Sequence, residues 1–363
     1  MVKKVERTDF IMSEKKNLVV VGFGGMGSWH VGHAQKSDCV NLLGIYDIKE
    51  EKRAAARAAG IYAYSSLDEV IADERVDLCT VAIPNDAHHD TVIRLLEGGK
   101  NVICEKPVAL SSQELSEMIA AAKASGKLFT VHQNRRWDVD YLASRKLRIE
   151  GKIGKLLRVE SRIHGANGIP SDWRRERAKG GGMILDWGVH LIDQMLRILP
   201  GRIVKVACEC THVHFDEVDD GFYLTITFDD GSVGAVEVGT CNYIPLPRFY
   251  IKGEYGTAII DDWRNNMRVV CDRLTGPDKD QKPVETAAGL TKTMAPRTEA
   301  TVKTWEEERP QSDVHDFYRN VCRAIDGKEP QLVTHDEVMR VMRVMEAAFE
   351  SDRLGGAPVA FEE

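Results

Sequence analysis

A chain of 363 residues is long enough for two domains, each with its own hydrophobic core. Its net charge of −7 disfavours a nucleic-acid-binding protein, and no apolar run reaches the length of a membrane span. The eight cysteines are interpreted as reduced thiols, and the charged N-terminus lacks the apolar core of a signal peptide. We therefore predict a cytoplasmic protein, with residues 1–16 as a flexible extension.

The first predicted element is a dinucleotide-binding turn. The apolar run Leu18–Val21 is followed at once by GFGGMG and a helix over 25–35. In this arrangement Gly22 allows a tight turn, Gly24 lets the backbone approach a pyrophosphate, and Gly27 lets helix and strand pack closely. The positive end of the helix then faces the phosphate charge. The residues predicted to contact the cofactor here are Gly22, Phe23, Gly24, Gly25, Met26 and Gly27.

Asp47 ends the second predicted strand, about twenty residues beyond the loop, where an acidic group can bind a ribose 2′-hydroxyl. Asp47 and Ile48 are predicted to contact the cofactor. A 2′-phosphate would be repelled by the carboxylate, so NAD is favoured over NADP, although the basic residues at 49, 52 and 53 soften that repulsion. The alternative for Asp47 is a turn residue or the N-cap of a helix over 50–59.

Strands and helices alternate through residues 17–135, which predicts a Rossmann domain with a doubly wound parallel sheet. Ligands of such sheets bind outside the carboxyl ends of the strands. The further segments predicted at those ends contain Ala82, Ile83, Pro84, Asn85, His88, Glu105, Lys106 and Asn134. The predicted strands are 18–21, 41–46, 76–83, 101–104 and 128–131.

Lys106 follows the fourth of these strands within Glu105-Lys106-Pro107. Beside a nicotinamide, its ammonium group could hydrogen-bond a substrate hydroxyl and stabilise a developing alkoxide. Taken alone, the motif also fits a surface charge pair before a loop proline.

Residues 136–363 are predicted to form an α+β substrate-binding domain with a large open mixed or antiparallel sheet, because its strands cluster instead of alternating with helices. The predicted strands are 155–163, 203–214, 221–228, 232–239 and 249–252, and the predicted helices are 138–149, 183–199, 312–325 and 335–352. The two late helices are expected to pack back on the first domain.

The segment GGGMILDWGVHLIDQ places Asp186 and His190 four residues apart. On an α-helix this spacing puts both side chains on one face, where a carboxylate can orient an imidazole that acts as a general base. The alternative is a solvated face of the helix.

Cys208, Cys210, His212 and His214 alternate along one predicted strand and would share one face. They would span roughly 20 Å and so cannot all converge on one tetrahedral ion. We therefore predict no metal site.

Polar and aromatic residues in the predicted loops around the 183–199 helix suit a polyol or a sugar, which needs hydrogen bonds and a flat stacking surface. The predicted substrate contacts, besides Lys106, Asp186 and His190, are Arg136, His164, Asn167, Trp173 and Tyr243.

The motifs GFGGMGSWH, AIPNDAHHD, CEKPVAL, Trp173-Arg174 and GGGMILDWGVHLID together resemble the glucose–fructose oxidoreductase / inositol dehydrogenase (Gfo/Idh/MocA) family, over residues 17–350. This resemblance implies that Lys106, Asp186 and His190 are catalytic. It also implies that the loop with Pro84, Asn85 and His88 lies beside the cofactor, that Trp173 and Arg174 help bind it, and that the open sheet builds a homodimer or homotetramer.

These expectations lead to an NAD-dependent dehydrogenase that oxidises a secondary hydroxyl of a sugar, a glycoside (at C3 in the first instance) or a cyclitol. Inositol dehydrogenation is the alternative within the same chemistry. Two further alternatives use the same cofactor. In one, the cofactor stays permanently bound and shuttles hydride between two sugars. In the other, the enzyme is a cofactor-dependent glycosidase. From another class, a non-catalytic dinucleotide sensor would keep GFGGMG without needing Lys106, Asp186 and His190.

Overall fold

The computed structural model describes residues 14–170, 172–215, 217–274, 276 and 278–362, and it divides into two compact units. The predicted N-terminal extension lies, up to residue 13, outside the described residues. Unit 1 holds the chain up to Asn134 together with Ala178–Gly180 and Asp313–Met342, and unit 2 holds the remainder. Over the described part of the chain, no helix has both the length and the apolar character that crossing a membrane requires.

Unit 1 is built on a parallel sheet of five strands, as the alternating pattern predicted, and their order is β2-β1-β3-β4-β5. Its central strands are nearly all buried, which explains their continuous apolar character. The strands are β1 (Lys16–Val21), β2 (Val40–Tyr46), β3 (Leu78–Val81), β4 (Asn101–Cys104) and β5 (Phe129–Val131).

The helices of unit 1 include two that we did not predict, α3 (Leu67–Ala72) and the longer α5 (Ser112–Ser125). The residues that begin and end α5 are nevertheless recognisable in the sequence. Ser111 accepts a hydrogen bond from the backbone of Glu114 at the start, and Gly126 ends the helix in the left-handed conformation at φ 65°. The others are α1 (Gly25–Ala34), α2 (Glu50–Ala58), α4 (His88–Glu97) and α8 (His315–Ile325), with the short turn η1 (Asn85–Ala87) before α4.

Helix α8 lies against α1, although nearly 300 residues separate them in sequence. His315 contacts the backbone oxygen of His33 at 3.3 Å, and the Tyr318 hydroxyl bonds to His30. Helix α9 (His335–Arg353) belongs to unit 1 up to Met342 and to unit 2 from Arg343.

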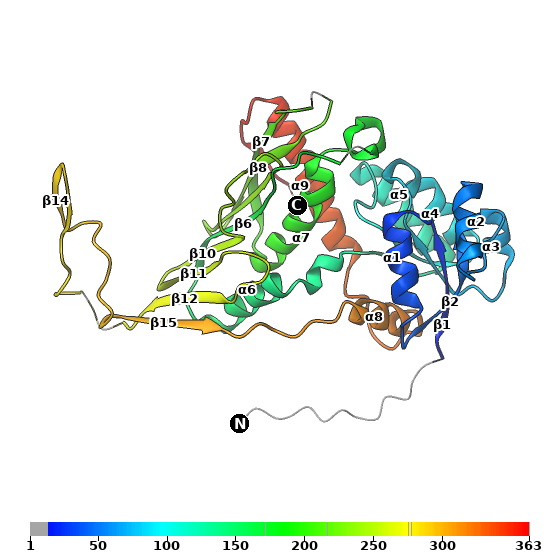
Figure 1. Cartoon of the computed structure of the whole chain (residues 1–363), viewed down its shortest axis with the longest axis horizontal. Coiled ribbons are helices and arrows are strands. Elements are labelled where there is room, and N and C mark those ends of the chain that lie inside the picture. The colour runs from blue at the N-terminus through cyan, green and yellow to red at the C-terminus, as the bar shows by residue number, and fades with distance from the viewer. Residues whose placement is uncertain (1–13, 171, 216, 275, 277, 363) are drawn as a thin grey trace. The chain divides into compact units, whose positions relative to one another are not determined.

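Unit 2 contains an open mixed sheet of nine strands, which confirms the predicted α+β half (Figure 1). Only β6 and β9 pair in parallel among its neighbours. The strands are β6 (Leu156–His164), β7 (Ile203–Thr211), β8 (Gly221–Phe228), β9 (Val233–Gly239), β10 (Phe249–Gly253), β11 (Gly256–Ile260), β12 (Met267–Asp272), β15 (Val302–Glu307) and β16 (Val359–Ala360).

Several strands beyond Gly253 were missed because they are short or alternate weakly. They are β11, β12, β15, β16 and the exposed hairpin β13 (Val284–Thr286) and β14 (Gly289–Thr291), which extends away from the large sheet (Figure 1).

The prediction that four metal-ligand residues share one strand was wrong. Strand β7 ends at Thr211, so Cys208 and Cys210 lie on it, whereas His212 and His214 follow it. The chain turns here because Asp220 accepts a hydrogen bond from the backbone N–H of His214 at 2.7 Å.

The helix predicted over 183–199 is divided. Residues Ile184–Gly188 form a single π-helical turn, η5, and the α-helix α7 runs over Val189–Ile198. Single π turns occur frequently at functional sites. A Cβ on Gly188 would lie 3.0 Å from Cζ of Phe222 on the sheet, so glycine lets the turn approach the sheet closely. The remaining helical segments of unit 2 are η2 (Asn134–Trp137, which begins in unit 1), α6 (Val139–Glu150) and η3 (Trp173–Arg175), whereas η4 (Arg177–Lys179) passes from unit 2 into unit 1.

Candidate active site

The glycine loop between β1 and α1 depends on two glycines for its packing. Gly22 has φ +100°, and a Cβ there would lie 2.2 Å from the carbonyl oxygen of Ala82. A Cβ on Gly27 would lie 2.0 Å from the carbonyl oxygen of Gly22. Both contacts are far shorter than van der Waals distance, so the turn and the helix can approach only without side chains.

Gly24 and Gly25 have a different environment. A Cβ at either position would meet no atom within 4 Å, and both residues are exposed. Helix α1 begins here with no side-chain cap and no acidic residue in its first turn. Its N-terminal N–H groups and its positive dipole end are therefore open to an anion. This chemistry fits the pyrophosphate of a dinucleotide.

Asp47 connects the end of β2 to the glycine loop. Its Oδ2 accepts a hydrogen bond from the Phe23 N–H at 2.7 Å, and its Oδ1 accepts one from the Lys49 N–H at 2.8 Å. The side chain of Ile48, beside it, is 82% exposed. A carboxylate has about four acceptor sites, so Asp47 can still accept a ribose hydroxyl while it orients the loop.

The predicted Pro-Asn-x-x-His loop is largely held by its own unit. The Asn85 amide donates to the carbonyl oxygen of Gly180 at 3.0 Å. The two ring nitrogens of His88 lie 2.9 Å from the oxygen of Pro107 and 3.0 Å from that of Ile83. Burial lowers the pKa of His88. Its ring is fully buried and therefore ties two loops together.

Glu105 was predicted to contact the cofactor, but the structure turns its carboxylate into unit 1. It is 5% exposed, and its Oε1 accepts hydrogen bonds from Nε2 of His30 and Nδ1 of His132, both at 2.8 Å. Oε2 accepts the N–H of Lys106 at 3.1 Å. Burial opposes ionisation, but the hydrogen bonds from the two histidines hold the pKa of Glu105 well below its usual range. The next side chain, Lys106, is only half-buried.

The protonation states of this cluster follow from its geometry. Burial lowers the pKa of His30 to about 4, so its ring is neutral at pH 7. An ionised Glu105 can only accept, so Nε2 of His30 carries the hydrogen. Nδ1 must then accept the hydroxyl hydrogen of Tyr318. Sequence reasoning missed Tyr318 because only the tertiary structure brings α8 to this position.

His30, Glu105 and His132 are also the one group of described residues whose possible metal-ligand atoms lie together, within 4.8 Å of one another. In each histidine, the ring nitrogen that faces Glu105 already makes a hydrogen bond to its Oε1.

In unit 2, Asp186 lies in the π turn and His190 in the first turn of α7. The Arg174 guanidinium donates to Oδ2 of Asp186 at 3.1 Å and to Asp172 at 2.7 Å, and it stacks on Trp173 at 4.6 Å. Sequence reasoning placed Arg174 near the cofactor and did not foresee this contact. The side chain of Asp186 is 15% exposed, whereas His190 is buried.

Asp219 fixes the start of the π turn. Its Oδ2 accepts the N–H of Ile184 at 2.8 Å, and a Cβ on Gly182 would lie 2.1 Å from its Oδ1. Burial raises the pKa of this carboxyl to about 6. Nothing in the local sequence pattern singled out Asp219.

Arg136, predicted to contact substrate, is instead buried in an ion pair. Its guanidinium donates twice to Asp193 on α7, at 2.8 and 2.5 Å. A bidentate pair of this kind orients the helix that carries His190. Its neighbour Arg135 stacks on Trp187, 4.2 Å from the ring centre, and lies 5.4 Å from Trp263, which sequence reasoning also missed.

The remaining predicted substrate residues lie at the ends of the parallel strands β6 and β9. The His164 side chain is buried, 3.0 Å from Glu237, and accepts the N–H of Leu246. Asn167 and Tyr243 follow these strands in exposed connections, and Tyr243 is 84% exposed.

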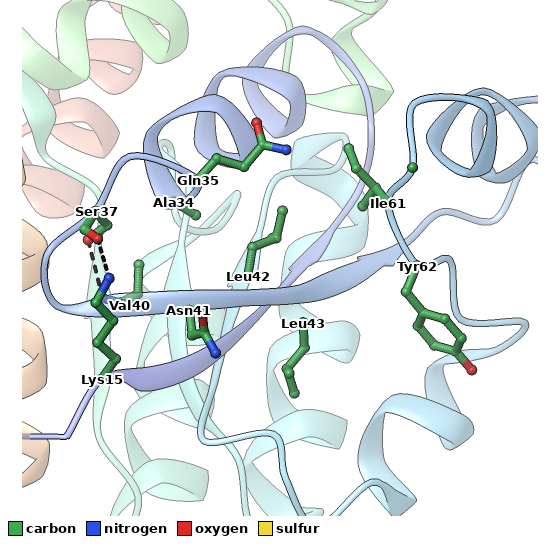
Figure 2. Close-up of a pocket in the computed structure, with 11 residues that line it drawn as sticks. Lys15, Ala34, Gln35, Ser37, Val40, Asn41, Leu42, Leu43, Ile61 and Tyr62 are labelled. Atoms are coloured by element: carbon green, nitrogen blue, oxygen red, sulfur yellow. Dashed lines mark hydrogen bonds between the residues drawn. The ribbon is translucent and has the colours of Figure 1, made fainter.

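A cavity of about 420 Å³ lies at the other end of β2 from Asp47 (Figure 2). It contains none of the predicted site residues. Its lining comprises Lys15, Ala34, Gln35, Ser37, Val40, Asn41, Leu42, Leu43, Gly60, Ile61 and Tyr62.

Comparison with known proteins shows the family of the chain. Residues 16–133 match a family model described as an oxidoreductase family with an NAD-binding Rossmann fold, and residues 141–259 match a GFO/IDH/MocA C-terminal domain. A crystal structure of an NAD-binding protein from Listeria innocua is 42% identical, covers 96% of this chain and 100% of its own, and superposes with a TM-score of 0.92.

Two relatives match most of the chain. One is an uncharacterized oxidoreductase of Schizosaccharomyces pombe, 27% identical over 331 residues, which are 83% of this chain and 86% of the relative. The other is scyllo-inositol 2-dehydrogenase (NADP(+)) of Bacillus subtilis, 27% identical over 345 residues, which are 92% and 93% of the two chains.

Proposed function

The chain belongs to the Gfo/Idh/MocA oxidoreductase family, and from this membership we propose that it is an NAD-dependent dehydrogenase of carbohydrates. The proposed reaction oxidises a secondary hydroxyl of a sugar, a glycoside or a cyclitol, with the 3-hydroxyl of a glucoside as the first substrate to test. The proposal of a sugar rests on exposed or half-buried polar and aromatic groups in unit 2, namely Asn167, Trp173 and Tyr243.

The observation that carries the proposal is the open N-terminus of α1. Gly24 and Gly25 leave space for a ligand beside uncapped backbone N–H groups. The space beside Gly22 and Gly27, in contrast, is occupied by the protein's own backbone. A plain turn would not need an open, uncapped helix end. A dinucleotide needs both the space and the N–H groups.

Asp47 supports NAD as the cofactor, because its carboxylate would accept a ribose 2′-hydroxyl and repel a 2′-phosphate. The Arg53 guanidinium, however, donates to the backbone oxygen of Asp47 at 2.6 Å, which keeps a positive charge nearby. NADP is therefore the second cofactor to test.

When bound, the nicotinamide supplies the acceptor for the substrate hydride. We propose that His190 takes the proton of the substrate hydroxyl and that Asp186 orients the imidazole. Arg174 supports this role, because it holds Oδ2 of Asp186 at 3.1 Å. Lys106 is proposed to donate a hydrogen bond to the substrate oxygen as negative charge develops.

Inositol dehydrogenation is the second candidate. It is favoured by the relative named scyllo-inositol 2-dehydrogenase (NADP(+)), because the match covers 92% of this chain. Both candidates use the same proton and hydride chemistry and differ only in the ring that is oxidised.

A homodimer or homotetramer through the large sheet is also proposed. Apolar side chains remain exposed on its strands, including Leu157 (38%), Val204 (38%) and Tyr223 (55%). Light scattering coupled to size-exclusion chromatography tests this proposal, and a monomer at micromolar concentration contradicts it.

The function is tested by following reduced nicotinamide absorbance with NAD or NADP and a panel of glucosides, free sugars and inositols. Turnover of a glucoside supports the first candidate, and turnover of inositols alone selects the second. The variant His190→Ala must abolish most of the signal, whereas His89→Ala, at a half-buried position in the first turn of α4, must not. NAD binding without turnover of any substrate contradicts the dehydrogenase and favours the sensor.

A further inference from the structure

Cys39 and Cys322 form a thiol pair in unit 1, although they are 283 residues apart. Cys39 directly precedes β2, and Cys322 lies on α8. The sulfur of Cys322 is 3.4 Å from the carbonyl oxygen of Cys39, so the two residues are in contact. All eight cysteines of the chain are free in the structure. This pair is therefore reduced and is carried by two segments in direct contact.

The segments that carry the pair are held together by charge. Arg319, one helical turn before Cys322, forms an ion pair with Asp38 at 2.9 Å. At the end of α8, Asp326 is 2.5 Å from the Lys16 ammonium on β1. These contacts keep the two sulfurs near each other without a covalent bond, so a disulfide would not require α8 to move far.

The environment of Cys39 favours its thiolate. The neighbouring Cys322 side chain outweighs burial and lowers the pKa of the Cys39 thiol to about 7. Ser37 adds a hydroxyl contact, with Oγ 3.4 Å from the sulfur, and Arg319 adds positive charge. A thiolate is the reactive form towards oxidants.

Cys39 is also partly accessible, whereas Cys322 is buried. Ser37 and Val40, which flank Cys39 in sequence, line the cavity at the start of β2 (Figure 2). An exposed nucleophilic thiol next to a buried partner thiol is the usual arrangement of an attacking and a resolving cysteine.

We propose that Cys39 is an oxidation site for hydroperoxides and that it forms a reversible disulfide with Cys322. The Cys39 thiolate attacks one oxygen of hydrogen peroxide, so that an S–O bond forms, the O–O bond breaks and hydroxide leaves. The sulfur of Cys322 then attacks Cys39, so that the S–S bond forms, the S–O bond breaks and water leaves. The two thiols supply two electrons to the peroxide, and a dithiol reductant restores them.

The other cysteines provide internal comparisons. Cys79 is fully buried, and burial raises the pKa of its thiol to about 12. Cys208 and Cys210 are two residues apart on β7, and Cys208 and burial raise the pKa of Cys210. Cys241 and Cys271 are partly exposed, as Cys39 is, and therefore serve as matched controls.

The test uses the full-length protein with hydrogen peroxide, followed by alkylation and peptide mass spectrometry. We expect a linked Cys39–Cys322 peptide pair, about 2 Da lighter than the reduced pair, that disappears with dithiothreitol. Before oxidation, iodoacetamide at pH 7.5 should modify Cys39 about tenfold faster than Cys241 or Cys271.

Two variants separate the parts of the proposal. Cys322→Ser keeps a hydrogen-bond donor but no sulfur, so Cys39 should still react rapidly with iodoacetamide. With peroxide, this variant should accumulate sulfenic acid at Cys39 and form no disulfide. Cys322→Ala removes the donor as well, so the pH midpoint of alkylation should rise towards about 8.5, the ordinary thiol value. Equal alkylation of Cys39, Cys241 and Cys271, or peroxide oxidation without the linked pair, would overturn the proposal. None of these readouts depends on the proposed dehydrogenase activity.

Discussion

Nε2 of His30 donates a hydrogen bond to Oε1 of Glu105 at 2.8 Å, and both side chains are buried. This contact joins the helix after the glycine loop to the residue before Lys106. The hydroxyl of Tyr318 on α8 orients the same imidazole from the other side. The proposed cofactor loop and the proposed catalytic lysine are thus connected inside unit 1 through one neutral histidine.

This contact predicts that unit 1 loses stability in mild acid. The pKa of His30 is lowered from 6.5 to about 4 by burial, so the unfolded chain binds a proton that the folded chain does not. The stability that the neutral His30 contributes is fully present above pH 6.5 and is lost as pH falls towards 4. The loss between pH 7 and pH 5 is about 2 kcal/mol. Urea unfolding at the two pH values measures it.

The variant His30→Gln is the control, since its amide can still donate to Glu105 but does not titrate. It should show a smaller difference between pH 7 and pH 5 than the unaltered protein. An identical difference would mean that other groups cause the acid sensitivity.

The packed and the open glycines of the loop should respond differently to substitution by alanine, one through stability and the other through NAD affinity. Gly27→Ala places a methyl group 2.0 Å from the oxygen of Gly22, so it should lower the free energy of unfolding by about 2–4 kcal/mol. Gly24→Ala meets no atom of the protein, so the melting temperature should hold while NAD affinity falls at least about tenfold. Calorimetry and nucleotide titration distinguish the two. Unchanged NAD affinity in Gly24→Ala would argue against a pyrophosphate at this position.

Asp47 predicts the preference between the two cofactors. In Asp47→Asn an oxygen remains to accept the Phe23 N–H, but the charge that repels a 2′-phosphate is gone. The ratio of NADP to NAD affinity should therefore rise about tenfold or more, since one charge contact contributes about 1.4 kcal/mol or more. Glu51→Gln, a charge change in the first turn of α2, is the matched control and should leave the ratio unchanged.

His190 is the proposed base, so His190→Ala should lower turnover by about 10²–10⁴ with little effect on NAD affinity. Asp186→Asn should lower turnover as well, because it keeps the shape of the side chain and removes its charge. The measurement is kcat with the substrate found in the panel, together with NAD titration. Undiminished turnover in His190→Ala would assign the base to another residue.

Asp219 predicts a pH effect of the opposite sign. Burial raises the pKa of this carboxyl from 3.8 to about 6, so its ionisation costs stability as pH rises through this window. Asp219→Asn keeps an acceptor for Ile184 and should stabilise the protein more at pH 8 than at pH 5, by about 1–1.5 kcal/mol. Melting temperatures at both pH values measure this difference.

The exposed Asp230 gives the contrast to Asp219. The Ser232 hydroxyl and backbone lower the pKa of Asp230, so Asp230→Asn should bring no gain at pH 8. A similar gain in both variants would point to net charge as the cause.

Much of the N-terminal half was predictable because its signals are local. Gly22, Gly27 and Asp47 act within one strand–turn–helix–strand segment, although the backbone that Gly22 meets, at Ala82, follows β3. The parallel order of strands follows from alternating strands and helices. The strands after Gly253 were missed because short, exposed strands carry little periodicity.

The sequence by itself determined the family, the two sheet types and the motifs that contain Lys106, Asp186 and His190. Only the tertiary structure decided which residues contact these motifs. Glu105 turns inward because two distant histidines compensate the cost of burying its charge. Asp186 faces Arg174, and Cys39 faces Cys322, because long-range packing brings these segments together. Such contacts depend on the whole chain and leave no periodic pattern in the residues beside them.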